Sequence, residues 1–440
     1  MMYTTVATLT NLGQYDLGGE LKFGSDGLLC GGAPHGGDFG QGGLYKASID
    51  GAVTFISFDG TNGASPGLPV QAPDGKFYGV ASFGGSMGAG TVYCLETNGN
   101  PKAIYSFDMT NGGVPSGFVI RTNGEFYGST IFGGIGYDGT PYSGAGVVFK
   151  MTTNGQFTLV ARLTDTNAFP VGLLEGSDGN FYVMTSRGGA YQYGTICRVT
   201  PDGQISTVVT FDGTNGEYPK GIILASDGAF YGCTGSGGIG FNGLNPGPGT
   251  VFRLSTNGDF TVLHEFNSTD GWEPVGLLLE VSNGVFYGVT YAGGRNSAGT
   301  IFQIASNGDF SVLLNFDSTW SKDSLPIIGL AKGPDGNCYG VTSMPRREIY
   351  CLRPVEAPVL QYKFQSDHIT LSWNGWGGLR YWLSYRTNLD EPVWHDPVWH
   401  DVGRMLTGAE TNGILSYTEP IDPAAPRFYK VEIYISEHWW

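Results

Sequence analysis

The side chains best suited to chemistry in this sequence are charged residues in its longer loops. Imidazole, carboxylate and guanidinium groups supply the acids, bases and anion partners that active sites use. Candidates that occur singly in an otherwise repetitive sequence are His35, Asp38, Asp138, Arg187, Arg295, Arg346 and Arg347. No spacing joins them into a nucleophile or an acid–base pair, so the sequence identifies no catalytic residue.

Two segments could bind a metal, and both have simpler explanations. Residues 392–401 read PVWHDPVWHD, a doubled unit that contains His395, Asp396, His400 and Asp401. A tandem slip that lengthened a loop accounts for the doubling. The segment FDGTNG at 58–63 and its relatives offer about three oxygen ligands each, whereas calcium takes six or more. We therefore expect capped turns there, and neither a metal nor another cofactor.

Aromatic side chains in the same loops indicate a different kind of site. Flat rings between glycines, with few charges nearby, suit stacking against the apolar faces of sugars. Phe83, Phe132 and Tyr291 precede a diglycine at related positions, so we expect them to pack between repeats. The predicted ligand-binding residues are Tyr137, Tyr142, Arg187, Tyr191, Tyr193, Arg295, Arg346 and Arg347.

These loops belong to a repeat whose turns recur through most of the chain. An Asx-Gly pair marks each unit, and seven such pairs are spaced by 48 to 56 residues, at Asp26, Asp74, Asn123, Asp178, Asp227, Asn283 and Asp335. A second series of six pairs begins at Asp50, Asn98, Asn154, Asp202, Asn257 and Asn307. Asx-Gly between short runs of β-branched and aromatic residues indicates tight hairpins, for which we expect type I′ turns.

Two hairpins per unit make four short strands, which is the content of a propeller blade. Seven units should carry fourteen such turns, but thirteen are present, because the last unit ends after its third strand. The opening YTTVATLTN has the pattern of a fourth strand. Residues near Thr5 to Thr10 should therefore close the ring as the outer strand of the last blade. The sequence predicts an all-β, seven-bladed β-propeller over residues 1–354, with an open solenoid as the weaker alternative.

Chain direction divides the loops of such a propeller between two faces. Because successive strands are antiparallel, the tight Asx-Gly turns share one face, and the longer connections after strands two and four share the other. We expect any binding surface on this long-loop face. The last unit has only TSMPRRE there, which predicts a notch that an extended ligand could enter over Arg346 and Arg347.

Residues 355–440 lack the glycine-rich period and indicate a separate small β-sandwich. The segments APVLQYKFQSDHITLSWNG, LRYWLSYRTNL, GILSYTEP and RFYKVEIYIS alternate as strands do, with Trp373 and Trp382 expected in the core. This segment resembles a fibronectin type III domain. The resemblance implies a spacer or an adhesive appendage.

Composition narrows the classes of partner and location. Charged residues make up 14% of the chain and its formal net charge is -16, which argues against a nucleic-acid partner. No window of 18 apolar residues exists, so no membrane span is expected. The six cysteines show no consistent pairing and are expected as reduced thiols. The opening MMYTTVATLTNL does not have the pattern of a signal peptide.

The whole repeat resembles the GloVer tandem repeat of large secreted or surface-tethered bacterial proteins. The shared pattern is D-G-x-F-Y-G-x-T, then G-G, G-T-V-F and N-G, then F-D-G-T-N-G-x-x-P-x-G, and it covers residues 3 to 353 approximately. The resemblance implies a secreted, propeller-like protein. It transfers no catalytic residues to this chain.

Together these patterns favour a non-enzymatic binding protein at the cell surface or outside the cell. The expected ligand is a glycan or another envelope component on the long-loop face. A polysaccharide lyase or hydrolase, with its active site on that face around the central channel, is the alternative. A scaffold with a protein partner is a third interpretation, and it differs from the first only in the class of ligand.

Overall fold

Every regular element in the described part of the chain is a β-strand. The computed structural model describes residues 2–8, 18–24, 26–48, 52–96, 99–140, 142–316, 329–342, 348–353, 361–365, 368–375, 380–386, 400–401, 406–407, 413–420 and 428–434. These residues include no helix of the length and apolarity needed to cross a bilayer. Contacts divide the chain into two compact units, Met1–Arg353 and Pro354–Trp440.

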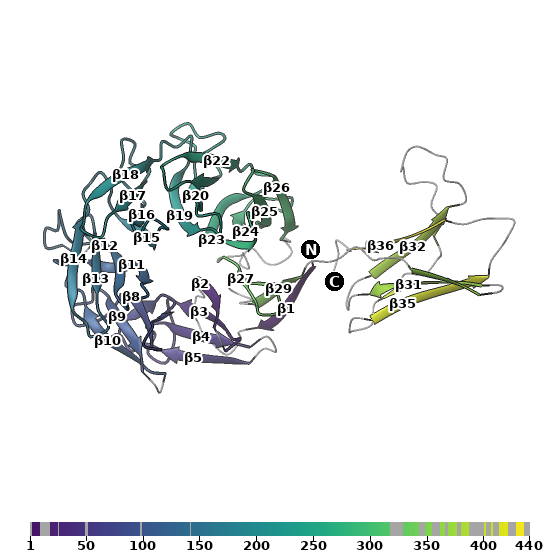
Figure 1. The fold of residues 1–440 in the computed structure, drawn as a ribbon, viewed down its shortest axis with the longest axis horizontal. Coiled ribbons are helices and arrows are strands. Elements are labelled where there is room, and N and C mark those ends of the chain that lie inside the picture. Colours follow the sequence, from purple (N-terminus) through teal and green to yellow (C-terminus); the bar gives the residue numbers. More distant parts are fainter. Residues whose placement is uncertain are drawn as a thin grey trace. The chain divides into compact units, whose positions relative to one another are not determined.

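Seven antiparallel sheets surround a common centre in the first unit (Figure 1). From the centre outward, blade one has β2 (Gly18–Phe23), β3 (Leu29–Ala33), β4 (Gly43–Ala47) and β5 (Val53–Ser57). Blade two has β6 (Ala64–Pro66) and β7 (Val70–Gln71) as a divided inner strand, then β8 (Phe77–Phe83), β9 (Thr91–Leu95) and β10 (Pro101–Ser106). Blade three has β11 (Gly113–Ile120), β12 (Phe126–Phe132), β13 (Val147–Met151) and β14 (Phe157–Arg162).

The next three blades repeat this order. Blade four has β15 (Pro170–Glu175), β16 (Phe181–Thr185), β17 (Thr195–Val199) and β18 (Ile205–Thr210). Blade five has β19 (Glu217–Leu224), β20 (Phe230–Ser236), β21 (Thr250–Leu254) and β22 (Phe260–Glu265). Blade six has β23 (Trp272–Ser282), β24 (Val285–Ala292), β25 (Thr300–Ala305) and β26 (Phe310–Asn315).

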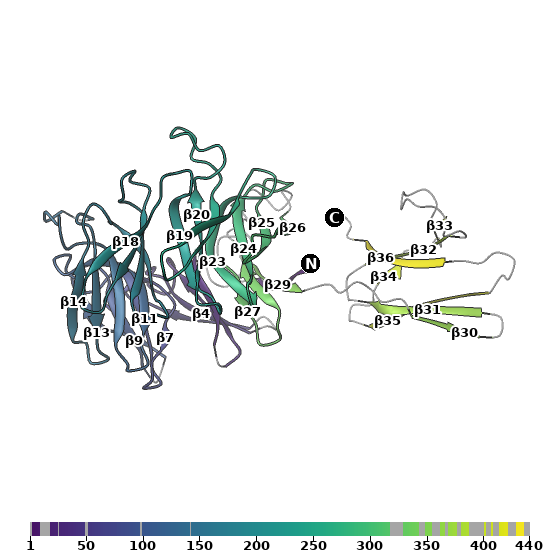
Figure 2. The ribbon, with the colours of Figure 1, turned by 45° about the horizontal axis from the view of Figure 1, so that its top comes forward.

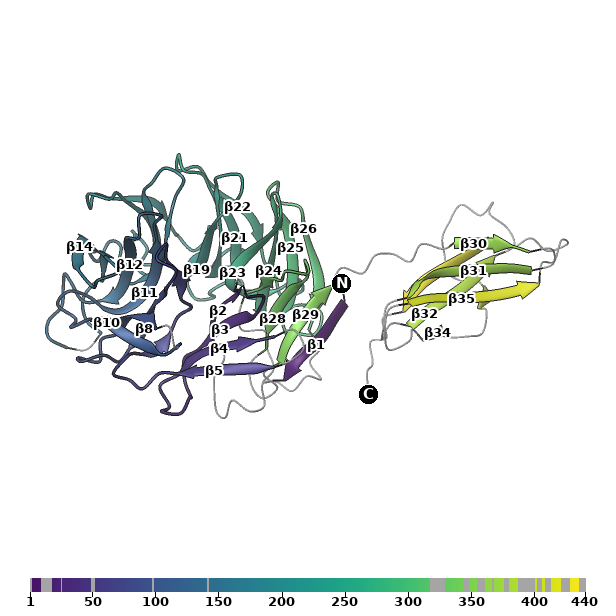
Figure 3. The same cartoon turned by 60° about the horizontal axis from the view of Figure 1, so that its bottom comes forward.

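Blade seven is completed by the N-terminal strand, which confirms the predicted closure of the ring. Its strands are β27 (Ala331–Lys332), β28 (Cys338–Val341), β29 (Glu348–Arg353) and, outermost, β1 (Met2–Thr8). Figure 3 shows β1 running beside β29, and the two strands pair antiparallel from Met2 opposite Arg353 to Thr8 opposite Glu348. An apolar cluster also joins blades one and seven, with Tyr45 and Tyr339 among its buried members. The seven-bladed β-propeller is therefore a closed ring.

The Asx-Gly turns form hairpins as expected, but the turn type differs from the prediction. In blade two the N–H of Gly75 donates to the carbonyl of Ala72 (2.9 Å), and the N–H of Ala72 donates to the carbonyl of Lys76 (2.8 Å). Gly75 has a φ of 83°, whereas Asp74 is not in the positive-φ region. This is a type I turn followed by a left-handed glycine, not type I′, because a type I′ turn centred on Asp74 and Gly75 needs a positive φ at both residues.

Each blade except the fourth packs a strand-two glycine under an aromatic ring of strand three. The opposed pairs are Gly31–Tyr45, Gly79–Tyr93, Gly128–Phe149, Gly232–Phe252, Gly288–Phe302 and Gly340–Tyr350. A Cβ atom on Gly288 would lie 2.2 Å from Cζ of Phe302. In blade four both positions change together, and Val183 lies opposite Cys197. The ring therefore occupies the volume that a side chain on the glycine would need.

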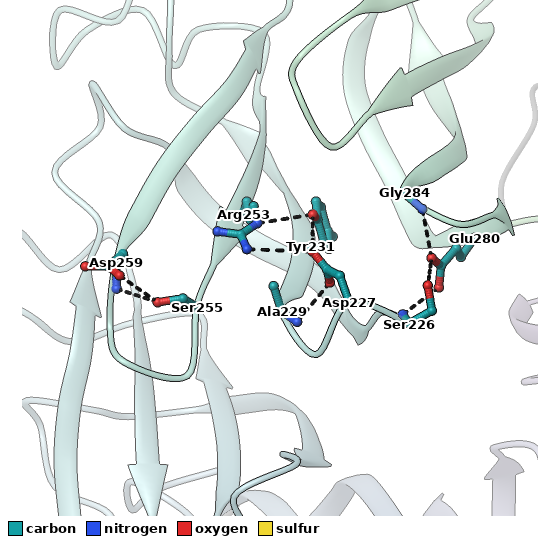
Figure 4. Close-up of polar contacts among 9 residues, drawn as sticks. All are labelled: Ser226, Asp227, Ala229, Tyr231, Arg253, Ser255, Asp259, Glu280 and Gly284. Atoms are coloured by element: carbon teal, nitrogen blue, oxygen red, sulfur yellow. Dashed lines mark hydrogen bonds and ion pairs between the residues drawn. The ribbon is translucent and has the colours of Figure 1, made fainter.

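Polar side chains join neighbouring blades on the face of the tight turns (Figure 4). Glu280 of blade six accepts hydrogen bonds from the Ser226 N–H (2.9 Å), the Ser226 hydroxyl (2.5 Å) and the Gly284 N–H (3.1 Å). Within blade five, Asp227 accepts the Tyr231 hydroxyl (2.9 Å), and the Nε–H of Arg253 donates to the Tyr231 oxygen (3.1 Å). These side chains on the turn face therefore stabilise the fold through hydrogen bonds within and between blades.

Glu280 should give the stability of the propeller a pH dependence. Burial acts to raise the pKa of its carboxyl, but the hydrogen bonds from Ser226 and Gly284 bring that pKa below its ordinary value. A carboxyl whose pKa is lowered on folding stabilises the fold above its unfolded pKa and loses this contribution as the pH falls through the folded pKa. We expect Glu280→Gln to lower the free energy of unfolding by about 1 kcal/mol at neutral pH, and by less in acid. Urea unfolding at several pH values measures this difference, and an equal loss at every pH would contradict an ionic origin.

All six cysteines are free, in agreement with the expected reduced thiols. Five of them are buried, and Cys30 is half-buried. Burial raises the pKa of the Cys233 thiol to about 12, so this group is not a thiolate at neutral pH. The cysteines act as small apolar side chains.

The second unit contains two small antiparallel sheets. One consists of β30 (Gln361–Phe364), β31 (His368–Gly375) and β35 (Gly413–Pro420). The other consists of β32 (Arg380–Arg386), β33 (His400–Asp401), β34 (Leu406–Thr407) and β36 (Phe428–Tyr434). Trp373 is 2% exposed, as expected of a core residue. The likeness to a fibronectin type III domain stays a prediction.

Candidate functional site

The connections after strands two and four share one face, as chain direction predicts. In blades two to six, the N–H of the second glycine of the diglycine donates to the segment that precedes the blade, as with Gly85 and the carbonyl of Gly60 (2.8 Å) and Gly189 and the carbonyl of Thr166 (2.8 Å). The long loops rise above β18 and β20 in Figure 2. Because backbone hydrogen bonds fix these loops, side chains on them are presented by a rigid support.

The inter-blade segments are capped turns whose oxygen atoms are already engaged. The Asp59 carboxylate accepts hydrogen bonds from the Thr61 N–H (2.8 Å), the Thr61 hydroxyl (2.8 Å) and the Asn62 N–H (3.0 Å). The Asn62 N–H contributes most to lowering the pKa of Asp59. Asp212 makes the same contacts between blades four and five. In the described part of the chain, no three His, Cys, Asp or Glu side chains gather into a possible metal site.

One aromatic cluster lies where blades three and four meet, and we call it the blade 3–4 cluster. The Phe132 ring centroid lies 5.4 Å from those of both Tyr142 and Phe169, edge to face in each case. The Arg187 guanidinium lies 5.5 Å from the Phe169 centroid. Tyr142 is 56% exposed, and Arg187 is also exposed. The rings of Phe132 and Phe169 therefore link an accessible tyrosine ring at one end to an exposed cation at the other.

A second aromatic cluster lies between blades four and five. The rings of Tyr191 and Tyr193 are almost parallel, with centroids 6.5 Å apart, and Tyr193 meets Phe241 edge to face at 5.3 Å. Phe241 packs on Gly213, where an added Cβ would lie 2.1 Å from the Phe241 ring. Tyr191 is 58% exposed. This blade 4–5 cluster therefore repeats the motif of an exposed ring on a half-buried support.

In each of blades two to six, the residue before the first proline of the inner strand has a left-handed backbone conformation. The five residues are Ser65, Val114, Phe169, Tyr218 and Glu273, with φ between 52° and 60°. Their N–H groups donate to carbonyls of the preceding blade, for example Phe169 to Ala145 (3.1 Å) and Glu273 to Pro248 (2.8 Å). Positive φ is unusual for non-glycine residues. Because it recurs at the same position, the conformation belongs to the scaffold, and it brings Phe169, Tyr218 and Glu273 to the site.

An ion pair and a buried carboxyl at the start of blades five and six escaped the sequence analysis. Lys220 Nζ lies 3.2 Å from Oε1 of Glu273, which joins blades five and six. Glu217 is 6% exposed, and burial raises the pKa of its carboxyl. Small residues, Ala64, Gly113 and Ala168, occupy the place of Glu217 in earlier blades. Glu217 and Lys220 follow an FDGTNG segment that resembles those of other blades. A comparison of the repeats position by position would have shown that these two side chains differ from their counterparts.

The structure brings together only part of the predicted ligand-binding set. Tyr142 and Arg187 belong to the blade 3–4 cluster, and Tyr191 and Tyr193 belong to the blade 4–5 cluster. Tyr137 is half-buried, and its N–H donates to Gly134 (3.3 Å). Arg295 is exposed on blade six, and Arg346 and Arg347 lie outside the described residues, so the notch stays a prediction.

The remaining sequence candidates have mixed outcomes. Phe132 packs between blades, as expected, whereas Phe83 and Tyr291 are each 38% exposed. Asp38 accepts the Ser57 hydroxyl (3.0 Å). Asp138 caps a turn, and the hydrogen bond from the Thr140 hydroxyl is the main cause that lowers the pKa of Asp138 to about 2. His395 and Asp396 lie outside the described residues, and of His400 and Asp401 only the backbone is described.

The blades and their loops define a propeller built from tandem repeats. The sequence profile of the Gloeobacter/Verrucomicrobia repeat matches residues 16–144 and 137–348, so this chain belongs to that repeat family. The match confirms the resemblance inferred from the repeat pattern. No curated protein matches the chain.

Solved structures similar to this chain share its fold and little of its sequence. The extracellular domain of the putative one-component system BT4673 from B. thetaiotaomicron is 10% identical with a TM-score of 0.55, and the match covers 98% of this chain and 57% of that one. Puromycin hydrolase is 14% identical with a TM-score of 0.51, covering 84% and 61%. The WD40 β-propeller domain of Doa1 is 12% identical with a TM-score of 0.51, covering 80% and 97%. This chain spans less than two thirds of the first two proteins, and these likenesses show the fold alone.

Proposed function

We propose that this protein is a non-enzymatic binding protein of the cell surface or extracellular space that holds an envelope glycan on its long-loop face. The observation that carries the proposal is the pair of aromatic clusters, each with an exposed tyrosine supported by half-buried rings. A ring held in this way can stack on a sugar without a loss of side-chain freedom. The extracellular domain among the similar structures supports the location, as does the secreted habit implied by the repeat.

The polar groups around the rings suit a polyhydroxylated ligand. Arg187 lies beside Phe169 in the blade 3–4 cluster, and Lys220 with Glu273 joins blades five and six. Such groups donate to and accept from hydroxyl groups while the rings contact the apolar face of the sugar. The chemistry required of the site is recognition, which needs no convergent nucleophile or base.

Removal of the two exposed rings should weaken retention on the polysaccharide that binds best. We expect Tyr142→Ala with Tyr191→Ala to cost about 1 to 3 kcal/mol for two rings, which is roughly 5- to 150-fold in affinity. The matched control is Tyr362→Ala, which removes a 69% exposed tyrosine from the second unit. A panel of envelope polysaccharides, measured by retention and then by titration, tests this. A native chain that retains no polysaccharide, or a double variant with unchanged affinity, would contradict the proposal.

Glu217 favours the alternative of a polysaccharide lyase or hydrolase on the same face. A buried carboxyl with a raised pKa is the state that a general acid requires. The same panel distinguishes the two functions when new reducing ends or unsaturated ends are assayed beside retention. Products that appear with the native chain and vanish with Glu217→Gln would establish the enzyme and exclude a purely binding role.

A further inference from the structure

The strand β30 lies at the edge of a sheet in the second unit. That sheet has the order β30-β31-β35, so among the described strands β30 pairs with β31 alone. Figure 3 shows β30 next to β31 and away from β35. All four residues of β30 are exposed. The free edge of such a strand offers N–H and carbonyl groups to another chain.

The register of the β30–β31 hairpin identifies the backbone groups that point to the free edge. The N–H of Gln365 donates to the carbonyl of His368 (2.8 Å), so these two residues form a hydrogen-bonded pair. Along an antiparallel ladder, hydrogen-bonded pairs alternate with pairs whose N–H and carbonyl groups point outward. In the register of β30 with β31, the outward-pointing groups of β30 are therefore those of Tyr362 and Phe364.

The side chains of Tyr362 and Phe364 belong to the apolar face of the sheet. Residues directly opposite each other in an antiparallel pair share a face, and Tyr362 lies opposite Leu371, which is 1% exposed. Tyr362 itself is 69% exposed and Phe364 is 62% exposed. Their ring centroids lie 5.5 Å apart, edge to face. The two rings therefore form one continuous apolar surface that extends the core face of the sheet into solvent.

The backbone of this edge points to a polypeptide as its ligand. Two exposed rings alone could stack on a sugar. However, the N–H and carbonyl groups of Tyr362 and Phe364 recur at the two-residue spacing of a β-strand, and the backbone of an added strand bonds all of them at once. The same two residues would supply the main-chain hydrogen bonds and the apolar contacts.

The opposite face of β30 determines the charge that suits an added strand. Lys363 is the charged residue of β30, and it alternates with the two rings, so its side chain lies on the other face of the strand. In a second copy of β30, the antiparallel register that sets Tyr362 opposite Phe364 would also set the two Lys363 side chains opposite each other. Like charges in that position destabilise a ladder. A different polypeptide with an acidic residue there is the complementary partner.

We propose that β30 binds an extended polypeptide as an added strand. Alternate apolar residues of that polypeptide contact the rings of Tyr362 and Phe364, and an acidic residue between them lies beside Lys363. Its backbone pairs with the free edge of β30. This role in protein binding belongs to the second unit, so it goes beyond glycan recognition by the propeller and does not depend on it.

A peptide selection on the full chain tests the proposal. Displayed random peptides are selected on the native protein after removal of those that bind the double variant Tyr362→Ser, Phe364→Ser. The retained peptides should carry apolar residues at alternate positions, with aspartate or glutamate between them, about threefold or more above the unselected library. Met87→Ser is the matched control, because Met87 is 69% exposed on the propeller, and it should bind the best peptide as the native chain does.

Two measurements on the best peptide test the strand geometry itself. N-methylation removes the N–H donor of one residue, so along an added strand it should weaken binding at every second residue by about tenfold or more. Lys363→Glu should weaken binding by about threefold, because it sets like charges opposite each other. Both measurements keep the rings of β30 intact, so neither depends on the folding of the double variant.

Other outcomes would overturn the proposal. A selection that retains no peptide, or an N-methyl scan without alternation, would exclude an added strand. A concentration-dependent dimer of the native chain that the double variant abolishes would assign the edge to a second copy. Loss of polysaccharide retention in the folded double variant would assign the two rings to a glycan. Tyr142→Ala, which weakens glycan binding, should leave peptide binding unchanged, and a loss there would place the peptide on the propeller.

Discussion

Replacement of Gly288 by valine should lower the free energy of unfolding by about 3 kcal/mol. Gly288 lies directly opposite Phe302 in the β24–β25 pair. A Cβ atom at position 288 would lie 2.2 Å from Phe302 Cζ and 2.8 Å from Leu278 Cδ2, well inside contact distance. The Phe302 ring is fully buried, so it has no space to move aside. Urea unfolding of the native and variant chains measures the loss.

A second substitution should recover part of that loss. Blade four already pairs Val183 with Cys197 at the equivalent positions, and both side chains are 0% exposed. Phe302→Cys alone should cost about 3 kcal/mol through the cavity that it leaves. In the double variant Gly288→Val, Phe302→Cys the valine fills that cavity. The loss of unfolding free energy in the double variant should therefore be about 2 kcal/mol smaller than the sum of the two single losses.

The control separates packing from the loss of glycine itself. At Gly172, in blade four, an added Cβ would meet only Met184 Cε, at 3.5 Å. Gly172→Ala should therefore change the free energy of unfolding little. If the losses of unfolding free energy at positions 288 and 302 were simply additive, the two side chains would not compete for the same volume. Packing would then not explain why blade four has Val183 opposite Cys197 in place of a glycine opposite a ring.

The architecture could be predicted because each blade repeats the same local requirements. The Asx-Gly pairs gave the number of hairpins, and the one missing turn gave the place of β1. The turn type could not be obtained in this way, because Asx-Gly serves both type I′ and type I with a left-handed glycine. Blade three, with Thr122 in the place of Pro73, makes the same hydrogen-bonded turn, so the preceding residue does not decide the type.

The candidate site was predicted less completely because it depends on contacts between blades. Tyr142 and Arg187 were selected as singular loop residues, but Phe169, which lies between them, reads in the sequence as one more residue before a proline. Glu217 and Lys220 follow the repeated FDGTNG segment and were taken as part of it. What distinguishes a functional side chain here is its difference from the same position in other blades, not its own type.

Deletion of residues 1–8 should open the propeller and lower the midpoint of thermal unfolding by about 5–10 °C. The deletion removes β1, which pairs with β29 from Met2 opposite Arg353 to Thr8 opposite Glu348. The edge of β29 would then present unpaired N–H and carbonyl groups, which promotes pairing with other chains. Calorimetry and light scattering should therefore show a lower midpoint together with more self-association.

A peptide with the sequence of residues 1–12, added to the shortened chain, should reverse both effects. A ligand that binds only the folded chain stabilises it by about 2.7 kcal/mol at a hundredfold excess over its dissociation constant. A peptide of the same composition in scrambled order is the control, because it lacks the side-chain pattern that fits β29. An equal midpoint of thermal unfolding in the shortened and the full chain would contradict the prediction. Closure of the ring would then rest on the apolar cluster between blades one and seven, where Tyr45 and Tyr339 are buried. Because that cluster packs side chains between blades one and seven whereas β1 supplies backbone hydrogen bonds to β29, we expect both to be needed.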